Sequence, residues 1–550
     1  MKKYKSYVFI LVAVCSLLPI ILYSQSVDTA WVRRYNGPGN GIDCSNKIAV
    51  DDSGNVYVTG FSTGTSTYTD YATIKYNSSG VQEWVQRHNG PGNDWDYANA
   101  IAVDNSGNVY VAGRSYGSGT SYDFATIKYN SNGVEQWVAR YNGPGNGNDM
   151  AFAIATDNTG NIYVSGGSYS SGTDYDYATV KYNSSGDTVW VRRYNGPGNS
   201  ADEAYAIAVD SAGNVYVTGY SRNTSSHGSE DYATIKYNSS GIEQWVTRYN
   251  GSGDGEDRAL SLTLDGQTNV YVTGYSIGSG TNYDYATIKY NSAGGTVWAK
   301  RYNGLGNNDD EAYAVALDGQ ANVYVTGYSI GSGTDYDYAT IKYNSAGDTV
   351  WVRRYNGPGN SDDEASALAL DGQANIYVAG YSTDSGTDDY AIVKYNSSGV
   401  QQWVVRYNGP GNSDNWANAI AVDGAGNIYV TGRSVGSGTD FDYATIKYVQ
   451  TIQGLEEKCS SISASGIQLK VYPNLAKSLS NIRYSLPKDS RISLQLYDIS
   501  GRLVKTFVNE QKKQGNYSAT LNSKTLSAGI YFLSLATEKQ RIIERLVVIK

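Results

Sequence analysis

Histidine, methionine, proline and cysteine are all scarce in this 550-residue chain, which contains 2, 2, 9 and 3 of them. Two histidines cannot supply a histidine-rich metal site, and they leave little scope for histidine-based catalysis. Charged residues make up only 17% of the chain, whereas apolar residues make up 40%. This composition provides enough material for a core and excludes a disordered chain.

Negative charge is concentrated in the middle of the chain. Residues 31–452 carry 25 Lys+Arg against 44 Asp+Glu, whereas residues 453–550 carry 15 Lys+Arg against 7 Asp+Glu. A segment this acidic repels phosphate backbones. We therefore expect no nucleic-acid partner.

The first 25 residues have the pattern of a signal peptide. Lys2, Lys3 and Lys5 precede an apolar run over 7–22, which is followed by small and polar residues. A retained membrane anchor is the alternative, but the run is short for a bilayer span and contains Pro19. The sequence predicts an exported mature chain without a transmembrane segment.

One sequence unit occurs eight times. Each unit opens at a tryptophan, and successive tryptophans are 52 to 55 residues apart: Trp31, Trp84, Trp137, Trp190, Trp245, Trp298, Trp351 and Trp403. In the second unit, Gly- and Asn-rich turns separate four strand-like runs, 84–87, 98–103, 108–112 and 124–129. A repeat of four strands and this length predicts one blade of a β-propeller.

Small residues and the last unit indicate how the blades are arranged. Ala98, Ala100 and Ala102 share one face of their run, which suits the crowded innermost strand of a blade. The unit that ends near Tyr448 has no tryptophan strand after it, so we expect the Trp31 strand to complete its sheet and close the ring. Eight blades are predicted; seven blades with a stray unit, or an open solenoid, remain alternatives because a repeat count does not fix closure.

A recurring pattern, Asp-x-x-Gly-Asn-Val-Tyr-Val-Thr-Gly, is present at 51–60 and 210–219. It resembles the bacterial β-propeller repeat known as SBBP, and the resemblance extends over 31–448. The resemblance implies a propeller and little about biochemical activity.

The chain after Tyr448 has a different composition and no repeat. Short runs alternate apolar and polar residues, as at 491–497, which predicts a small immunoglobulin-like antiparallel sandwich. The predicted domains are a signal peptide at 1–25, an all-β propeller of eight ~53-residue repeats at 26–449, a linker at 450–464 and a C-terminal domain at 465–550.

The C-terminal domain resembles the type A sorting domain of the type IX secretion system. The resemblance rests on a set of matching positions: Tyr472-Pro473-Asn474, Asp498, Gly501-Arg502, Leu526, Gly529, Tyr531 and the ending 546–550. Leu475 stands where the family usually has a second proline. The resemblance implies the type IX machinery as a partner, passage through the periplasm and across the outer membrane, and removal of the tail with release or surface attachment.

Most chemistry-bearing residues recur in every unit and so indicate structure. His88 replaces a repeated tyrosine, and His227 lies in a longer loop; neither has an obvious nucleophile nearby, so no catalytic residue is assigned. Two sets of aspartates recur around the ring, typified by Asp70 and Asp43, and are attributed to turns and inter-strand hydrogen bonds. No metal ligands and no cofactor are assigned, although calcium in these loops stays open.

Breaks in the repeat are the better functional candidates. Trp95 and Trp416 are the only tryptophans outside the repeated position, and both precede an alanine-rich run. If eight blades close, these residues and Tyr97 share a sector of one face, where aromatic rings can stack on sugars or peptide groups. The alternative is that each ring only covers its own loop. Another candidate is a set of charged residues at one repeat position, which comprises Glu203, Glu311 and Glu364, with Arg258 between them in the sequence. They could line a polar patch, but no general acid and no nucleophile can be assigned among them.

Two cysteines remain after signal removal, Cys44 in the first unit and Cys459 just beyond the last. In an oxidising compartment they are predicted to form a disulfide that staples the ring.

Three functions compete. The first is a secreted or surface-associated propeller that binds an extracellular glycan or protein without catalysis. The second is a secreted, carboxylate-dependent glycoside hydrolase or lyase, since fold does not decide function. The third is a structural surface component or adhesin whose blades provide a rigid disc.

Overall fold

The computed structural model describes residues 24–224, 229–331, 335–453, 467–472, 475–476, 479–498, 502–527, 529–537 and 540–548. Most of the predicted signal peptide and linker, together with His227 and Cys459, lies outside them. The chain divides into two compact units, with the boundary after Gln453. Across the described ranges both units are all-β, without an α-helix, and so no helix there is long and apolar enough to cross a membrane.

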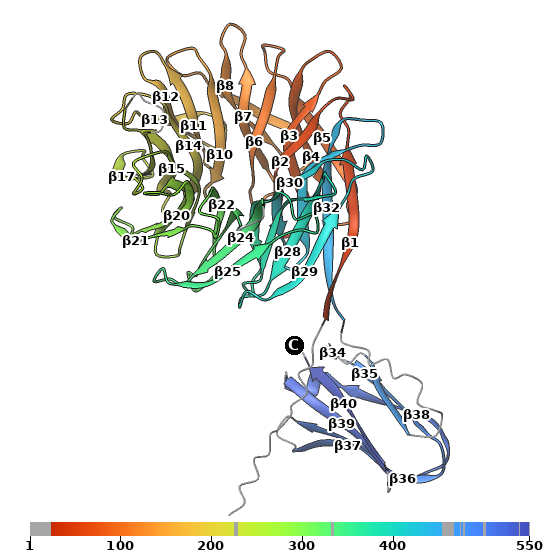
Figure 1. The fold of residues 1–550 in the computed structure, drawn as a ribbon. Helices are drawn as coiled ribbons and strands as arrows, with labels where there is room; N and C mark the ends of the chain where they lie inside the picture. The colour runs from red at the N-terminus through yellow and green to blue at the C-terminus, as the bar shows by residue number, and fades with distance from the viewer. Residues whose placement is uncertain are drawn as a thin grey trace, which may run out of the picture. The chain divides into compact units, whose positions relative to one another are not determined.

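The first unit contains eight four-stranded sheets within its described residues (Figure 1). One sheet has the order β2 (Asp43–Val50), β3 (Val56–Thr63), β4 (Thr69–Tyr76) and β5 (Gln82–His88). Six sheets repeat this order with β6 (Asp96–Val103), β7 (Val109–Tyr116), β8 (Tyr122–Tyr129), β9 (Glu135–Tyr141), β10 (Asp149–Thr156), β11 (Ile162–Ser170), β12 (Asp174–Tyr182), β13 (Thr188–Tyr194), β14 (Asp202–Val209), β15 (Val215–Arg222), β16 (Glu230–Tyr237), β17 (Glu243–Tyr249), β18 (Asp257–Leu264), β19 (Val270–Ile277), β20 (Tyr283–Tyr290), β21 (Thr296–Tyr302), β22 (Asp310–Leu317), β23 (Val323–Ile330), β24 (Tyr336–Tyr343), β25 (Thr349–Tyr355), β26 (Asp363–Leu370), β27 (Ile376–Asp384), β28 (Thr387–Tyr395) and β29 (Gln401–Tyr407). Apart from Asn108, β5 to β8 contain the four strand-like runs predicted for the second repeat.

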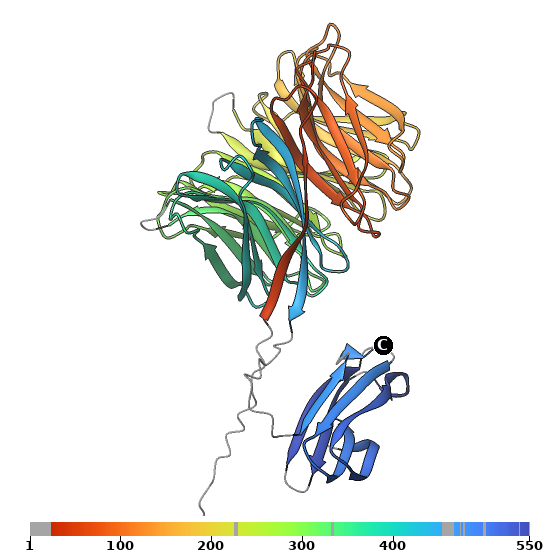
Figure 2. The ribbon, with the colours of Figure 1, turned by 90° about the vertical axis from the view of Figure 1, so that its right-hand side faces the viewer.

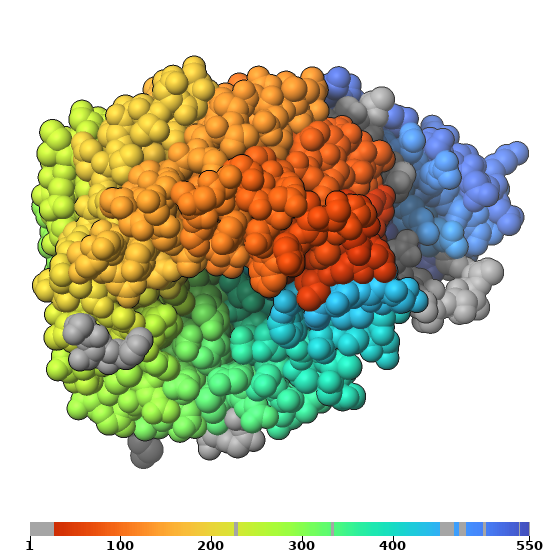
Figure 3. Space-filling view, turned by 90° about the horizontal axis from the view of Figure 1, so that it is seen from above, coloured from red at the N-terminus to blue at the C-terminus, as the bar shows by residue number. Residues whose placement is uncertain are grey.

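The remaining sheet joins the two ends of the repeat array. Its order is β1 (Ser24–Tyr35), β32 (Phe441–Gln453), β31 (Ile428–Val435) and β30 (Asn415–Val422). Strands β1 and β32 pair antiparallel from Ser24 opposite Gln453 to Tyr35 opposite Tyr443, and they run side by side in Figure 2. The Trp31 strand therefore completes the last sheet, as the sequence predicts. Seen from above, the red start of the array lies against its cyan end (Figure 3).

The first strand of each sheet packs against the first strand of the next, and β30 packs against β2. These strands carry small residues, as the sequence predicts: in β6, Ala98 is fully buried and Ala100 is 5% exposed. A β-bulge lies between these two alanines and recurs at the equivalent place in the other seven first strands. Because a bulge adds one unpaired residue, it breaks the simple alternation predicted for Ala98, Ala100 and Ala102.

Side chains from one sheet hydrogen-bond to the backbone of the next. The Trp84 indole N–H donates to the Ser131 carbonyl at 3.2 Å, and the Tyr71 hydroxyl donates to the Ala125 carbonyl at 3.2 Å. The Tyr443 hydroxyl makes the equivalent bond to Ala72 at 3.0 Å, between the last sheet and the first. A buried aromatic ring with a satisfied polar group thus contributes both apolar packing and a directional bond.

A partly buried ion pair joins the two outer strands of every sheet in the first unit. In the first sheet, Arg87 donates to Asp70 Oδ2 at 2.7 Å and to the Ser62 carbonyl at 2.8 Å. The other sheets repeat the ion pair: Arg34–Asp442, Arg140–Asp123, Arg193–Asp176, Arg248–Asp231, Arg301–Asp284, Arg354–Asp337 and Arg406–Asp389. These inter-strand contacts confirm the structural interpretation of the Asp70 set.

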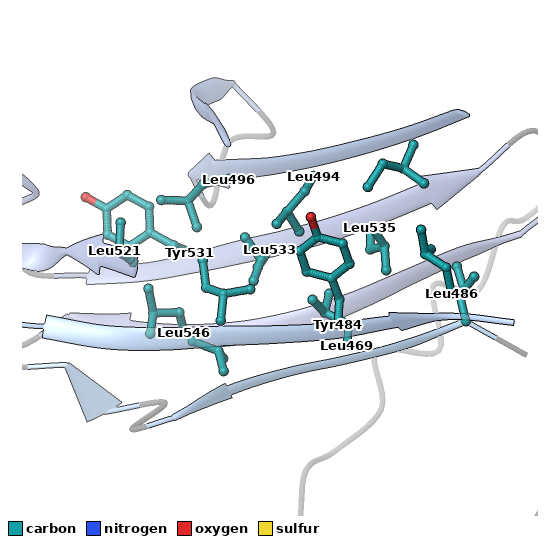
Figure 4. Packing of buried hydrophobic residues seen from close by; sticks show 14 of the residues in the cluster. Leu469, Tyr484, Leu486, Leu494, Leu496, Leu521, Tyr531, Leu533, Leu535 and Leu546 are labelled. Atoms are coloured by element: carbon teal, nitrogen blue, oxygen red, sulfur yellow. The ribbon is translucent and has the colours of Figure 1, made fainter. Parts of the chain in front are cut away.

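The described part of the second unit has two sheets around one apolar core. The smaller is β33 (Gln468–Tyr472), β35 (Leu479–Leu486) and β38 (Gly515–Asn522); the larger is β34 (Leu475–Ala476), β40 (Arg541–Val548), β39 (Gly529–Thr537), β36 (Ser490–Asp498) and β37 (Leu503–Lys512). A 3₁₀ turn occupies Ser523–Thr525. Alternate leucines of β36 and β39, such as Leu494 and Leu533, point into this core together with Leu469 from β33 (Figure 4).

Candidate functional site

One end of every sheet in the first unit, which we call the constant end, makes the same contacts throughout. In the first sheet, the Asp51 carboxylate accepts hydrogen bonds from the backbone N–H groups of Ser53 and Asn55 and from the Tyr57 hydroxyl at 3.0 Å. Seven aspartates make equivalent contacts with a tyrosine hydroxyl: Asp104, Asp157, Asp210, Asp265, Asp318, Asp371 and Asp423. The fold itself requires these residues.

The opposite end, which we call the variable end, contains the loops before each first strand and between each second and third strand. The second residue of the first strand changes around the ring: Cys44, Tyr97, Met150, Glu203, Arg258, Glu311, Glu364 and Trp416. Its partner in the second strand changes as well: Phe61, Arg114, Gly167, Tyr220, Tyr275, Tyr328, Tyr381 and Arg433. Because one fold accepts all of these residues, packing within a sheet does not dictate them, and this end is the candidate binding surface.

An exposed aromatic group lies at the variable end between the first two sheets. Trp95 is 44% exposed and Tyr68 is 58% exposed, and their ring centres are 5.9 Å apart. Tyr97 lies 6.0 Å from Trp95 and 4.9 Å from Phe61. We call these four residues the aromatic platform. The structure therefore brings together two of the predicted site residues, Trp95 and Tyr97.

Tyr68 is not among the residues predicted from the sequence, although the repeat contains a signal for it. In the second, third, fifth and sixth sheets the tyrosine of this loop directly precedes the recurring aspartate, as Tyr122 precedes Asp123, whereas Tyr68 stands one position earlier. A shift of one residue in extended chain reverses the direction of the side chain. Tyr122 packs against Tyr116 with their ring centres 5.3 Å apart, while Tyr68 is exposed.

Arg114 extends the platform toward the third sheet. Its guanidinium carbon lies 4.5 Å from the centre of the Tyr97 ring and 5.2 Å from the centre of the Tyr122 ring. An arginine between two aromatic faces gains cation–π attraction and keeps the rings apart. The cation thereby fixes the orientation of Tyr97 beneath Trp95.

Trp416 lies in a different cluster. Its indole N–H donates to Asp388 Oδ2 at 2.6 Å, and the Arg433 guanidinium carbon lies 3.7 Å above its ring. The Tyr381 ring is 5.8 Å away. Among the described residues, no ring contact joins Trp416 to the aromatic platform, and Cys44 occupies the equivalent position in the first sheet, between Trp416 and Tyr97. Trp416 thus belongs to a different aromatic cluster from Trp95 and Tyr97, not to the one sector predicted.

Three carboxylates of the variable end are paired. Tyr205 donates to Glu203 Oε2 at 2.9 Å, and Tyr313 donates to Glu311 at 3.1 Å. Arg258 pairs with Glu256 at 2.7 Å. Burial raises the pKa of Glu203 and of Glu311, which favours their protonated forms. Each of these carboxylates thus has its partner two residues away in the sequence.

Cys44 is buried, and its thiol accepts a hydrogen bond from Asn418 Nδ2 at 3.4 Å. Burial raises the pKa of the thiol to about 11. Ser45 bonds to Gly432, which pairs with Ala444; Gln453 is nine residues farther along β32, or about 30 Å. Cys459 is only six residues beyond Gln453, too few to span this distance back to Cys44. A disulfide between Cys44 and Cys459 would therefore require the end of β32 to separate from β1. The disulfide stays a prediction, and two free thiols in mass spectra of the non-reduced protein would contradict it.

The described residues contain no group of three or more His, Cys, Asp or Glu side chains that could hold a metal ion. His88 faces the Tyr71 ring at 5.9 Å, at the position where Tyr141 faces Phe124 in the next sheet. Burial lowers the pKa of His88 to about 4, so its ring is neutral at physiological pH. Packing therefore accounts for this histidine.

Two family models match the chain. The model described as beta-propeller repeat (SBBP) matches residues 30–66, 83–119, 189–225, 350–386 and 402–439. The model described as secretion system C-terminal sorting domain matches residues 470–550. The five repeat matches fall on strands of the first unit, and the sorting-domain match covers the sheets of the second.

Similarity to individual proteins is low. Regulatory protein FlaEY of Caulobacter vibrioides is 27% identical over 208 residues, which are 33% of this chain and 21% of that protein, so the chain spans about a fifth of this relative. Similar solved structures include PorZ of the Porphyromonas gingivalis type IX secretion system, with 12% identity, coverage of 92% of this chain and 81% of PorZ, and a TM-score of 0.31. The polysaccharide lyase Uly1 has 11% identity, coverage of 78% and 99%, and a TM-score of 0.38.

The sorting domain indicates export to the cell surface or secretion, and it implies interaction with the type IX machinery. The repeats assign the first unit to the β-propeller architecture. This chain contains SBBP-type β-propeller repeats and a C-terminal type IX secretion sorting domain.

Proposed function

We propose that this type IX-delivered propeller binds an extracellular glycan or protein and does not catalyse a reaction. The observation that carries the proposal is the exposed pair Tyr68 and Trp95 at the variable end. Burial of a large aromatic side chain lowers the free energy of the system. Two exposed rings side by side therefore indicate a surface that a binding partner covers. Because residues 31–452 are acidic, a neutral or cationic partner is favoured over a polyanion.

The eight sheets are, in this proposal, the blades of one closed eight-bladed propeller. The pairing of β1 with β32 and the bond from Tyr443 to Ala72 support closure. Closure removes the free sheet edges that an open array would expose at its ends. A closed ring holds the loops of the variable end in a fixed arrangement, as a preformed binding surface requires.

The second unit is proposed to be an immunoglobulin-like sandwich that is cleaved after export. Its two sheets and single leucine-rich core support the sandwich. Residues 1–25 are proposed to be a signal peptide that brings the chain to the periplasm, before the C-terminal domain directs it across the outer membrane.

A glycan array and an extracellular-protein pull-down test the binding function. The informative variant is Tyr68→Ala with Trp95→Ala, and the matched control is Leu305→Ala, since Leu305 is 77% exposed on a loop of the same end. We expect the double variant to lose at least about tenfold in affinity, or about 1.4 kcal/mol, and the control to bind like the wild type. Equal binding by all three proteins would contradict the platform as the site.

A carboxylate-dependent hydrolase or lyase is the second candidate, and the raised pKa of buried Glu203 and Glu311 favours it. A general acid needs such a shift. The test is turnover of a panel of polysaccharides. Turnover by the wild type that is lost in Glu203→Gln or Glu311→Gln would support the hydrolase or lyase function. Absence of both turnover and binding would favour a structural surface component.

A further inference from the structure

A hollow of about 310 Å³ opens at the variable end between the second and third sheets. Its lining residues are Ser121, Gly147, Asn148, Tyr169, Asp174 and Tyr175. They belong to the loop before β8, the loop before β10, and the adjoining ends of β11 and β12. The volume is at the lower end of the range for small-ligand sites. It suits a compact polar unit rather than a folded segment of protein.

The lining is polar and offers both donors and acceptors. The Ser121 hydroxyl bonds to Asn148, whose amide N–H donates to the Tyr175 hydroxyl at 3.4 Å. Burial raises the pKa of Tyr175, so its hydroxyl keeps its proton. Asp174 adds the one charged group of the lining. Hydroxyl groups of a sugar can satisfy such a mixture, whereas a carboxylate or sulfate would meet the charge of Asp174.

The hollow and the aromatic platform belong to one continuous surface. Ser121 directly precedes Tyr122, and Arg114 lies between the rings of Tyr122 and Tyr97. Tyr97 in turn contacts Trp95. We propose that this surface binds a neutral polysaccharide chain, with one sugar in the hollow and the following sugars stacked across the platform. This inference rests on the proposed binding function and specifies its ligand class.

Calorimetry with neutral oligosaccharides of increasing length, prepared from β-glucan, xylan and mannan, tests the inference. Wild-type affinity should rise with chain length until both parts of the surface are occupied. Tyr175→Ala removes a ring and a hydroxyl from the lining of the hollow, and Asp174→Asn removes the charge while keeping a residue that tolerates the φ of 63°. Tyr175→Ala should abolish the length dependence and weaken binding of the longest chains at least tenfold.

Trp95→Ala distinguishes this inference from the proposed function. If Tyr175→Ala binds every length like the wild type while Trp95→Ala does not bind, the hollow is excluded as a sugar site and the platform stands. If the wild-type protein binds only a protein in the pull-down, or binds uronic-acid chains of equal length as tightly as neutral ones, the neutral polysaccharide is excluded. Unchanged thermal melting of each variant establishes that it is folded. Asp174→Asn should bind uronic-acid chains more tightly than the wild type does. A lower affinity of this variant for uronic-acid chains would also contradict the inference.

Discussion

The Tyr443 hydroxyl donates a hydrogen bond to the Ala72 carbonyl at 3.0 Å and so joins the last sheet of the repeat array to the first. The equivalent bond recurs between neighbouring sheets, as from Tyr71 to Ala125. The second sheet differs, because Phe124 stands at this position and has no hydroxyl to donate. The protein thus contains both versions of one inter-sheet contact.

Tyr443→Phe should lower the free energy of unfolding by about 1 kcal/mol, since the buried Ala72 carbonyl loses one of its hydrogen-bond donors with little change in volume. Phe124→Tyr should raise it by a similar amount, because the new hydroxyl would face the carbonyl of Ala178. Chemical denaturation of both variants measures the two effects. Changes of the same sign would contradict the role assigned to this bond.

The repeated tryptophans provide a matched pair for a second test. The Trp351 indole N–H donates to the Ser397 carbonyl at 3.3 Å, whereas the buried Trp403 N–H has no partner within the described residues. The two side chains are 7% and 8% exposed. Trp351→Phe should therefore destabilise the protein by about 1 kcal/mol more than Trp403→Phe does. Equal losses in denaturation would mean that packing alone accounts for both.

Buried Asp363 predicts a pH effect. Burial raises its pKa to about 6, despite hydrogen bonds from Gly357 and Ser382 that lower it. The folded state therefore favours the protonated form, so the stabilisation from Asp363 is complete below the ordinary value of 3.8 and is lost as the pH rises through about 6. Asn415 is the natural equivalent in the last sheet. Between pH 4.5 and 7.5, the free energy of unfolding of Asp363→Asn should rise by about 2 kcal/mol relative to that of the wild type.

Asp371 at the constant end is the control for this pH effect. Burial acts to raise its pKa, but hydrogen bonds from Asn375 and Tyr377 lower it below the ordinary value. Its stabilisation is present above pH 3.8 and is lost as the pH falls further. Asp371→Asn should therefore leave the slope between pH 4.5 and 7.5 unchanged. Melting curves across this range would refute the assignment if both variants changed the slope equally.

Removal of the sorting domain should stop export without unfolding the first unit. The two units have separate cores, and the sorting-domain match covers only residues 470–550. A chain truncated after residue 453 should accumulate in the periplasm of a host with type IX secretion. Fusion of residues 465–550 to a periplasmic reporter should export the reporter. Cell fractionation checks both, and export of the truncated chain would contradict the prediction.

Much of the fold could be predicted because one sequence unit is repeated eight times. The strand-like runs of the second repeat lie in β5 to β8, and the Trp31 strand completes the last sheet. The β-bulge between Ala98 and Ala100 could not be predicted, since small residues fit a regular strand as well as a bulged one.

The candidate site was less predictable. A break in the repeat identified Trp95 and Trp416, but distance along the sequence does not show which side chains share a cluster. Trp416 bonds to Asp388 in the neighbouring sheet, and Tyr68 from the first sheet completes the surface around Trp95. Both contacts cross from one repeat to the next.

The sequence by itself determined the repeat, its strands, the sorting domain and the positions where the repeat is broken, because each is a local pattern of residue types. The tertiary structure alone decided which of these positions form a surface. Packing of neighbouring sheets brings their loops together, places Tyr68 beside Trp95, separates both from Trp416 and leaves the hollow between the second and third sheets. Such neighbours depend on the packing between sheets, which no single repeat encodes.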